Sequence, residues 1–484
     1  MRDQSAYPEL GLWLRGRLVA GGGRRTETVL DPSTGEPLGE LPHARGDDLE
    51  AALAVAAEAF TTWRASSPTE RSAVLRAAAA LLRAEAAELA ALIRTELGKP
   101  TTQAEREVDT VVELLEWAAE ECRRGYGRVI PARRSGLRLT TTLEPIGPVA
   151  AFAGWNAPAI TPARKISGAV AAGCPVVIKP SEATPATALF LVRALERAGL
   201  PPGVVSVVFG DPPTIADTLL RSDTIRMLTF TGSTEVGRRL AALAARTMKR
   251  MVLELGGHAP VLIFPDVDVA AVARRAAEAK FRNAGQVCTS PTRFYVHHAV
   301  YPAFVDHFAE AAAALRVGDP GDPRTQMGPL RTSQRLTAVS DLVADAVALG
   351  ATVRAGGRRL DRAGFFFAPT VLTEVSADCR VANEEPFGPI AQLAAFATTD
   401  EAVALANRLP VGLSAYVFGN NLATVRDVTD RLRAGNVSVN HWVASFPETP
   451  FGGFGDSGVG VEGGVDGARA FLQTKVVSED AGPV

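Results

Sequence analysis

The segment KFRNAGQVCTSPTRF (residues 280–294) places Cys288 among Asn, Gly, Gln, Ser, Thr and Arg residues. A cysteine used only for packing behaves as a small apolar residue, so this polar setting predicts an accessible, reactive thiolate.

Glu254, in MVLELGGHAP (residues 251–260), has apolar or glycine neighbours. Burial there would raise the pKa of its carboxyl toward the range of a general base; a Glu bonded to nearby backbone N–H groups is the alternative.

Asn156 is a third candidate for chemistry, in the segment FAGWNAP (residues 152–158). It follows an expected strand, and its amide could donate a hydrogen bond to an oxyanion. Asparagine is also common in turns for structural reasons, which is the alternative.

Two further segments could hold a dinucleotide. LTFTGSTEVG (residues 228–237) places Gly232, Ser233 and Gly237 between an expected strand and an expected helix, whose free N–H groups could bind a pyrophosphate. A plain helix cap is the alternative. VVIKPSEATP (residues 176–185) puts Lys179 and Glu182 at a strand end, where they could bind ribose hydroxyls or serve only the local structure. A thiol, a carboxylate, an amide donor and a dinucleotide site together suit covalent oxidation of an aldehyde.

The elements that must position these residues follow from the apolar pattern. Residues 48–99 are rich in Ala, Leu, Glu and Arg and predict helix up to Pro100. From Glu144 onward, short apolar runs alternate with helical stretches, which predicts a parallel, doubly wound sheet that binds ligands at its carboxyl edge. The Gly-Gly-His-Ala-Pro break at residues 256–260 predicts a domain boundary before a second alternation. Residues 126–145 and 469–479 could pair as a projecting β-arm.

Composition limits the class of protein. A chain of 484 residues is too long for one core and predicts two or three domains. The charged fraction of 21% and net charge of −2 give no reason to expect nucleic acid or a membrane surface as a partner. No signal peptide or membrane span is expected. The scattered Cys122, Cys174, Cys288 and Cys379 predict neither a metal site nor a redox pair, and we expect a cytoplasmic protein.

Seven motifs occur in an order and at a spacing that identify a known pattern: WNAP, KPSEATP, FTGSTEVG, LELGGHAP, GQVC, EEPFGP and PFGGFGDSGVGVEGG. In these motifs the chain resembles the aldehyde dehydrogenase superfamily over nearly its whole length. The resemblance implies an α/β fold with a Rossmann-type cofactor domain (residues 1–125 and 146–254) and an α/β catalytic domain (255–438). It also implies an oligomerisation arm (126–145 and 470–484) and a substrate-mouth loop with a return segment (439–469). A homodimer or homotetramer is expected.

The resemblance assigns roles to the three candidates for chemistry. Cys288 is the implied nucleophile, Glu254 the general base, and Asn156 the oxyanion donor together with the backbone N–H of Cys288. The implied reaction passes through a thiohemiacetal and a thioester, which water hydrolyses to a free acid. Glu462 matches a family glutamate on a proton exit route, although a solvated surface Glu is the alternative.

The resemblance also assigns a cofactor site for NAD, with NADP as the alternative. The carboxylate of Glu182 repels a 2′-phosphate, whereas Ser181 and Lys179 could tolerate one. The implied contacts are Lys179, Ser181 and Glu182 for the adenosine ribose, Gly232, Ser233 and Gly237 for the phosphates, and Trp155, Leu255, Glu385 and Phe387 around the nicotinamide.

The substrate side is most similar to succinate-semialdehyde dehydrogenases. Arg164, Arg282 and Ser445 match the residues that hold the distal carboxylate there, a task that suits the bidentate guanidinium group. Structural salt bridges of both arginines are the alternative, with broad aliphatic or aromatic aldehydes as substrates. Ala157 replaces a common Phe and would widen the entrance, so a longer semialdehyde or an aromatic aldehyde could fit.

The loop NHWVASFPETP brings His441, Trp442 and Phe446 to the expected mouth of the pocket. His441 could contact substrate or make a structural hydrogen bond. A non-catalytic binding or structural member of the fold is the remote alternative.

Overall fold

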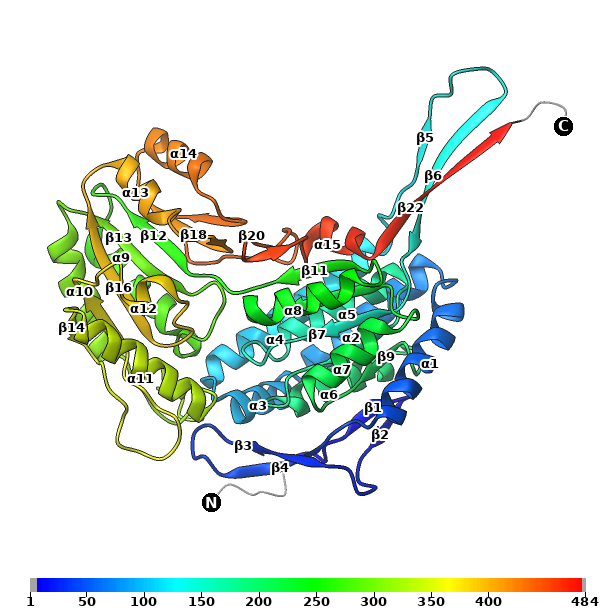
Figure 1. Cartoon of the computed structure of the whole chain (residues 1–484), viewed down its shortest axis with the longest axis horizontal. Helices are drawn as coiled ribbons and strands as arrows, with labels where there is room; N and C mark the ends of the chain where they lie inside the picture. The colour runs from blue at the N-terminus through cyan, green and yellow to red at the C-terminus, as the bar shows by residue number, and fades with distance from the viewer. Residues whose placement is uncertain (1–6, 481–484) are drawn as a thin grey trace.

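Two largely parallel sheets organise the chain in the computed structural model, which describes residues 7–480 (Figure 1). The first sheet has the order β2-β1-β9-β8-β7-β10-β11-β21. Its strands are β1 (Leu12–Leu14), β2 (Arg17–Val19), β7 (Val149–Phe152), β8 (Val176–Lys179), β9 (Val205–Val207), β10 (Met227–Thr231), β11 (Arg250–Glu254) and β21 (Gly458–Val459). The five strands from β9 to β11 are parallel, whereas the edge strands β1, β2 and β21 are antiparallel. Strands β7, β8 and β10 are buried along their whole length, as their uninterrupted apolar runs predict.

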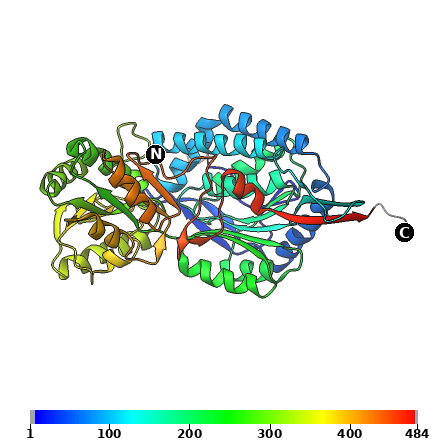
Figure 2. The ribbon, with the colours of Figure 1, turned by 90° about the horizontal axis from the view of Figure 1, so that it is seen from above.

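Helices cover both faces of the first sheet. They are α1 (Gly46–Trp63), α2 (Pro68–Ala84), α3 (Ala86–Leu97), α4 (Thr101–Glu121), α5 (Ile160–Ala172), α6 (Pro185–Arg197), α7 (Pro212–Arg221) and α8 (Thr234–Ala245). Helices α2 to α6 pack on one another, and α7 packs on α1 and α8. Figure 2 shows the sheet between blue and cyan helices on one side and green helices on the other. The doubly wound arrangement predicted from the sequence is confirmed.

The helical stretch expected over residues 48–99 is three helices rather than one. Helix α1 ends at Trp63, and α2 starts at Pro68, where a missing N–H is tolerated. Ser67 and Glu70 form a capping box at this start. A second break lies at Glu85, between α2 and α3.

The second sheet has the order β14-β15-β16-β13-β12-β18-β19. Its strands are β12 (Ala259–Ile263), β13 (Pro291–His297), β14 (Thr352–Ala355), β15 (Thr370–Thr373), β16 (Ile390–Phe396), β18 (Ser414–Phe418) and β19 (Asn436–Val439). Its helices are α9 (Val269–Phe281), η2 (Arg282–Gly285), α10 (Tyr301–Ala314), α11 (Ser333–Ala348), α12 (Arg380–Asn383), α13 (Thr399–Ala406) and α14 (Leu422–Arg431). All pairs except β14 with β15 are parallel.

A three-stranded arm projects from the body (Figure 1). It is formed by β5 (Arg128–Ile130), β6 (Leu137–Pro145) and β22 (Leu472–Asp480), with β22 antiparallel to β6 along its whole length. The remaining elements are the hairpin β3 (Thr26–Leu30) and β4 (Pro37–Pro42), the pair β17 (Val411–Gly412) and β20 (Phe454–Gly455), and α15 (Gly464–Ala470). No helix within residues 7–480 is long and apolar enough to cross a bilayer.

The buried apolar residues fall into separate clusters. One cluster contains residues from Leu10 to Leu255 together with Phe471, and the other two begin at Ala259 and Leu262. This gap supports our proposal that the cofactor and catalytic domains divide near residues 254 and 255. Residues 1–6 of the proposed cofactor domain and 481–484 of the proposed arm lie outside the described residues.

Candidate active site

The carboxyl ends of β7, β10 and β11 meet at one edge of the first sheet, since Thr231 of β10 pairs with Glu254 of β11. Strand order reverses between β7 and β10, because β8 and β9 continue on one side and β11 on the other. Ligands of open α/β sheets bind at such a switch point. The segments that leave these strands carry Asn156 and Ser233, so the sheet itself brings the sequence candidates to one place.

Cys288 reaches this edge from the segment between β12 and β13 of the second sheet, after the short helix η2. Its Sγ lies 3.9 Å from Oε1 of Glu254, and the residue is half-buried. Burial raises the pKa of the Cys288 thiol well above its usual range, and the carboxylates of Glu254 and Glu385 raise it further, against the opposing charge of Arg164. These surroundings favour the neutral thiol, so the reactive thiolate expected from the sequence must form by giving its proton to a base.

The carboxyl of Glu254 is 4% exposed and accepts a hydrogen bond from the hydroxyl of Thr231 at 3.1 Å. Burial and the neighbouring Glu462 raise its pKa to about 7, while Arg164 and Lys165 oppose the shift. A group with such a pKa can accept and return a proton near neutral pH. The pKa rise expected from its apolar run is confirmed.

A buried polar chain continues from Glu254 through Thr231 and Lys165 to Glu462. The ammonium of Lys165, fully buried on α5, donates to Thr231 Oγ1 at 2.8 Å and forms an ion pair with Glu462. Glu462 is only 5% exposed, so the alternative of a solvated surface residue is wrong. Sequence reasoning missed Lys165, although a lysine in the apolar run KISGAVAA was a signal that could have been followed.

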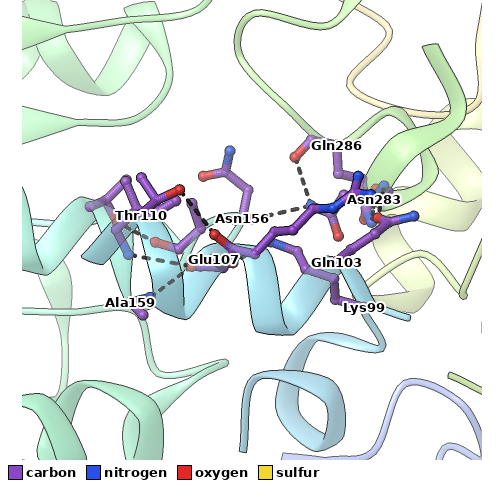
Figure 3. A network of polar contacts seen from close by, with 12 residues as sticks. Lys99, Gln103, Glu107, Thr110, Asn156, Ala159, Asn283 and Gln286 are labelled. Atoms are coloured by element: carbon purple, nitrogen blue, oxygen red, sulfur yellow. Dashed lines mark hydrogen bonds and ion pairs between the residues drawn. The ribbon is translucent and has the colours of Figure 1, made fainter. Parts of the chain in front are cut away.

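Asn156 lies in the loop between β7 and α5. Its backbone oxygen accepts a hydrogen bond from Asn283 Nδ2 at 3.1 Å, which ties it to the loop that carries Cys288 (Figure 3). Within residues 7–480 the side-chain amide of Asn156 has no hydrogen-bond partner, and the residue is partly exposed. The amide is therefore free to donate to a bound oxyanion.

The adenosine end of the expected cofactor site contains a preformed ion pair. Lys179 Nζ lies 2.6 Å from Glu182 Oε2, and Glu182 Oε1 accepts from the backbone N–H of Gly210 at 3.0 Å. Ser181 uses its hydroxyl in a local turn with Ala183 N–H at 3.2 Å. This strand end can offer a ribose both a cation and a carboxylate.

The phosphate end is the start of helix α8. Ser233 caps this helix by accepting from Val236 N–H, so the capping alternative is correct for its hydroxyl. A Cβ on Gly237 would lie 2.3 Å from the side chain of Leu255, so the glycine lets α8 approach the segment after β11. Gly232 precedes the cap and bonds through its N–H to the carbonyl of Glu254 at 3.1 Å. These features fit a dinucleotide phosphate near the helix start.

The expected nicotinamide contacts gather around an aromatic pair. The rings of Trp155 and Phe387 meet edge to face, with centroids 5.4 Å apart. A Cβ on Gly256 would lie 2.6 Å from Glu385 Oε2, which places this carboxyl against the segment that follows Leu255. Burial raises the pKa of Glu385 to about 8.

The substrate candidates are only partly brought together. Arg164 donates to Ser445 Oγ at 2.7 Å, and its guanidinium lies 4.6 Å from the ring centre of Phe451. The Nε atom of Arg164 is buried without a partner within the described range. Arg282 is exposed, and within residues 7–480 its side chain has no hydrogen bond or ion pair with Arg164 or Ser445. Burial raises the pKa of the Tyr416 phenol to about 12, and the nearby charge of Arg282 partly opposes this rise.

The mouth loop has a mainly structural arrangement. His441 Nδ1 accepts from Val443 N–H at 3.2 Å, and the ring of Trp442 packs on Phe418 at 4.3 Å. Phe446 is 43% exposed.

Sequence reasoning missed Tyr416 of strand β18, whose hydroxyl donates to the carbonyl of Thr289, next to Cys288, at 2.7 Å. No cluster of metal-ligating side chains occurs in the described part of the chain.

Comparison with known proteins identifies the family. A model of the aldehyde dehydrogenase family matches residues 19–477. The chain is 46% identical to 4-(hydroxymethyl)benzenesulfonate dehydrogenase TsaD1 of Comamonas testosteroni, covering 92% of this chain and 93% of that protein. It is 39% identical to succinate-semialdehyde dehydrogenase [NADP(+)] GabD of Escherichia coli K12, with the same two coverages.

The fold has close solved relatives. Betaine aldehyde dehydrogenase of Staphylococcus aureus, solved in complex with NAD+, superposes with a TM-score of 0.96 at 28% identity, covering 98% of this chain and 96% of that chain. The fold, the class of cofactor and the oxidation of an aldehyde that the resemblance implies are thereby confirmed. The chain belongs to the aldehyde dehydrogenase family and is an NAD(P)-dependent enzyme.

Proposed function

We propose that this enzyme oxidises an aldehyde with a distal carboxylate, such as succinic semialdehyde, to the free carboxylic acid. The observation that carries the proposal is the setting of Arg164. Ser445 holds its guanidinium on one side and Phe451 lies against it, while its buried Nε lacks a partner. A buried guanidinium N–H without a partner, close enough to Cys288 for its charge to lower the thiol pKa, favours a substrate that brings an anion.

In the proposed reaction, Cys288 Sγ attacks the aldehyde carbon while Glu254 takes the thiol proton across the 3.9 Å gap. The amide of Asn156 and the backbone N–H of Cys288 donate to the oxyanion. When bound, NAD(P) supplies the acceptor for the hydride that leaves the carbon, and a thioester remains on Cys288. After Glu254 has released the thiol proton, it takes a proton from water, and the resulting hydroxide attacks the thioester. The C–S bond breaks, the acid is released, and the leaving Cys288 thiolate takes back a proton from Glu254.

The excess proton can leave along the buried chain from Glu254. Thr231, Lys165 and Glu462 are connected by hydrogen bonds and an ion pair, which supports a proton path away from the substrate. This arrangement also supports water as the acyl acceptor, because a general base remains available for the second half of the reaction.

NAD is the proposed preferred cofactor. The charge of Lys179 is already paired with Glu182, so little free positive charge remains there for a 2′-phosphate. We further propose a homo-oligomer joined through the arm and a location in the cytoplasm.

An aromatic aldehyde that carries an anionic group is a second candidate. Ala157 is small and half-buried beside Asn156, and exposed Phe446 lies in the mouth loop. The name of the relative TsaD1 refers to a benzenesulfonate. An aromatic ring would need the wider entrance that a small side chain at position 157 leaves.

The test compares initial rates of NADH formation with succinic semialdehyde, butanal, benzaldehyde and 4-formylbenzenesulfonate. Wild type is compared with Arg164→Met and Arg282→Met, and with Arg274→Met as a control on the exposed face of α9. Loss of a charged hydrogen bond is worth about 1.5–3 kcal/mol, so we expect kcat/KM for the anionic substrate to fall about 10- to 100-fold in Arg164→Met. Butanal turnover falls by a smaller factor, which reflects the loss of the Arg164 charge that lowers the pKa of Cys288 and Glu254; the ratio of the two losses therefore measures the carboxylate contact.

Equal losses for charged and neutral aldehydes in Arg164→Met would contradict the carboxylate pocket and leave the arginine with a structural role. A preference for 4-formylbenzenesulfonate over succinic semialdehyde would select the second candidate.

A further inference from the structure

Helix α4 contacts both segments that carry the proposed reacting groups, although it contributes no residue to the chemistry. Figure 3 shows Glu107 of this helix near Ala159 and Gln103 of this helix near Asn283. The loop of Asn156 leads into α5. Asn283 lies in η2, five residues before Cys288, in the proposed catalytic domain. A single rigid helix therefore spans the junction that fixes the distance between oxyanion donor and nucleophile.

On one side, Glu107 of α4 serves as the missing cap of α5. The sequence gives α5 no capping side chain at Ala159. Glu107 Oε1 accepts from the N–H groups of Ala159 at 3.0 Å and Ile160 at 3.3 Å, and its other oxygen pairs with buried Lys99. A carboxylate at a helix start is stabilised by the free N–H groups and the helix dipole. The loop that precedes α5 is thereby anchored to α4.

On the other side, Gln103 of α4 holds the nucleophile loop. Its Oε1 accepts from the backbone N–H of Asn283 at 2.9 Å. Asn283 and Ala284 both have left-handed backbones, with φ of 50° and 52°, a conformation that persists only where surrounding contacts impose it. Asn283 Nδ2 donates to the carbonyls of Gln286 and Asn156, both at 3.1 Å. The side chain of Asn283 thus joins the two loops directly.

We infer that Asn283 and Gln103 are positioning residues that set the oxyanion donor Asn156 against Cys288. This inference rests on the proposed role of Asn156. Asn283 clamps the backbone of Asn156, and Gln103 holds the strained turn of Asn283 in place. Neither side chain touches the reacting atoms, so each acts through the position of Asn156.

The test is a double-mutant cycle on the rate of NADH formation in the first turnover. Asn283→Gly removes the clamping amide while allowing the left-handed backbone, and we expect a fall of about 10- to 100-fold with the aldehyde KM nearly unchanged. Asn156→Ala alone lowers the rate about 100-fold. In that background, Asn283→Gly lowers the rate by less than about twofold, because the group it positions is gone.

Variants of Gln103 give an independent arm of the test. Gln103→Met removes the acceptor for Asn283 N–H at similar length and lowers the rate, whereas Gln103→Glu keeps an acceptor oxygen and recovers part of it. The recovery is partial because Gln103 Nε2 also donates to the carbonyl of Gln326 at 2.9 Å, which a carboxylate cannot do. Thr102→Ala, at an exposed neighbouring position of α4, serves as the control and leaves the rate unchanged. The Gln103 series decides the inference even where Asn283→Gly does not fold.

The two possible failures are distinguishable. Full activity of Asn156→Ala would overturn the proposed role of Asn156 itself. The positioning inference alone would be overturned if Asn156→Ala lost most of its activity and Asn283→Gly lowered the rate by the same factor in that background as in the wild type. It would also be overturned if Gln103→Glu recovered none of the rate lost in Gln103→Met.

Discussion

At the scale of single residues, the site holds two acids whose neutral forms are favoured. Burial raises the pKa of the Cys288 thiol above its usual range and that of Glu254 to about 7. Glu254 is therefore ionised in only part of the molecules at neutral pH, and the step that needs its carboxylate depends on pH in that range. The nearby Glu462 contributes to this pKa through charge repulsion.

We predict that kcat rises with pH through about 7 in the wild type, and that Glu462→Gln moves this rise to lower pH. Removing a negative neighbour favours the ionised form of Glu254 and so lowers its pKa; the positive Lys165, left without its partner, acts in the same direction. The measurement is kcat against pH under saturating substrate. Glu479→Gln, on the exposed arm, is the control, and a rise that stays in place or moves to higher pH in Glu462→Gln would contradict the prediction.

At the scale of elements, the strands were predictable and the loops were not. Strands such as β7 and β10 are buried on both faces, so the sequence must be apolar throughout, and that pattern is visible without a structure. The motifs also predict which loops carry Asn156 and Cys288. The left-handed turn of Asn283 and Ala284 leaves no such pattern, because contacts with Gln103 and Asn156, distant in sequence, impose it.

The close approach of two loops at Gly285 gives a prediction about stability. Gly285 has φ of 71°, and a Cβ there would lie 2.1 Å from the carbonyl oxygen of Gly388. Gly285→Ala must therefore both strain the backbone and push apart the loops of Cys288 and Phe387. We expect a loss of unfolding free energy above the roughly 1–3 kcal/mol of backbone strain alone, together with loss of activity.

The matched control is Gly350→Ala, because Gly350 has φ of 94° but nothing within 4 Å of an added Cβ. Thermal unfolding and NADH formation of the two variants are compared with the wild type. Equal losses of stability in both would mean that the contact with Gly388 does not matter.

At the scale of the whole molecule, residues from segments of both large sheets meet at the proposed site. The chain crosses from β11 to β12 at residues 254–259 and later returns, so that β21 pairs with β11 in the first sheet. The sequence predicts the order of the motifs and the fold class, and the resemblance implies that Arg164 and Ser445 share a site, but neither predicts that Glu462 pairs with Lys165. These contacts join segments about 300 residues apart and depend on how the return segment packs.

The arm gives a prediction about assembly. Val129 and Val476 are 74% and 65% exposed on its strands, although apolar side chains in strands usually pack. We predict that wild type has the mass of a homo-oligomer and that the double variant Val129→Lys, Val476→Lys has a smaller one, measured by size-exclusion chromatography with light scattering.

Val353→Lys is the control, since Val353 is also exposed but lies on β14 of the second sheet. A wild-type protein with the mass of a single chain would contradict the assembly, and an unchanged mass in the double variant would contradict the role of the arm.

The neutral thiol of Cys288 has a consequence for the durability of the enzyme. Peroxides and electrophiles attack thiolates far faster than thiols. Burial and the carboxylates of Glu254 and Glu385 raise the pKa of the Cys288 thiol, and so slow its oxidation and alkylation. A positive charge beside the sulfur, such as that of an oxidised nicotinamide ring, lowers the thiol pKa and makes Cys288 more reactive. We therefore expect peroxides and electrophiles to inactivate the enzyme mainly when the oxidised cofactor is bound.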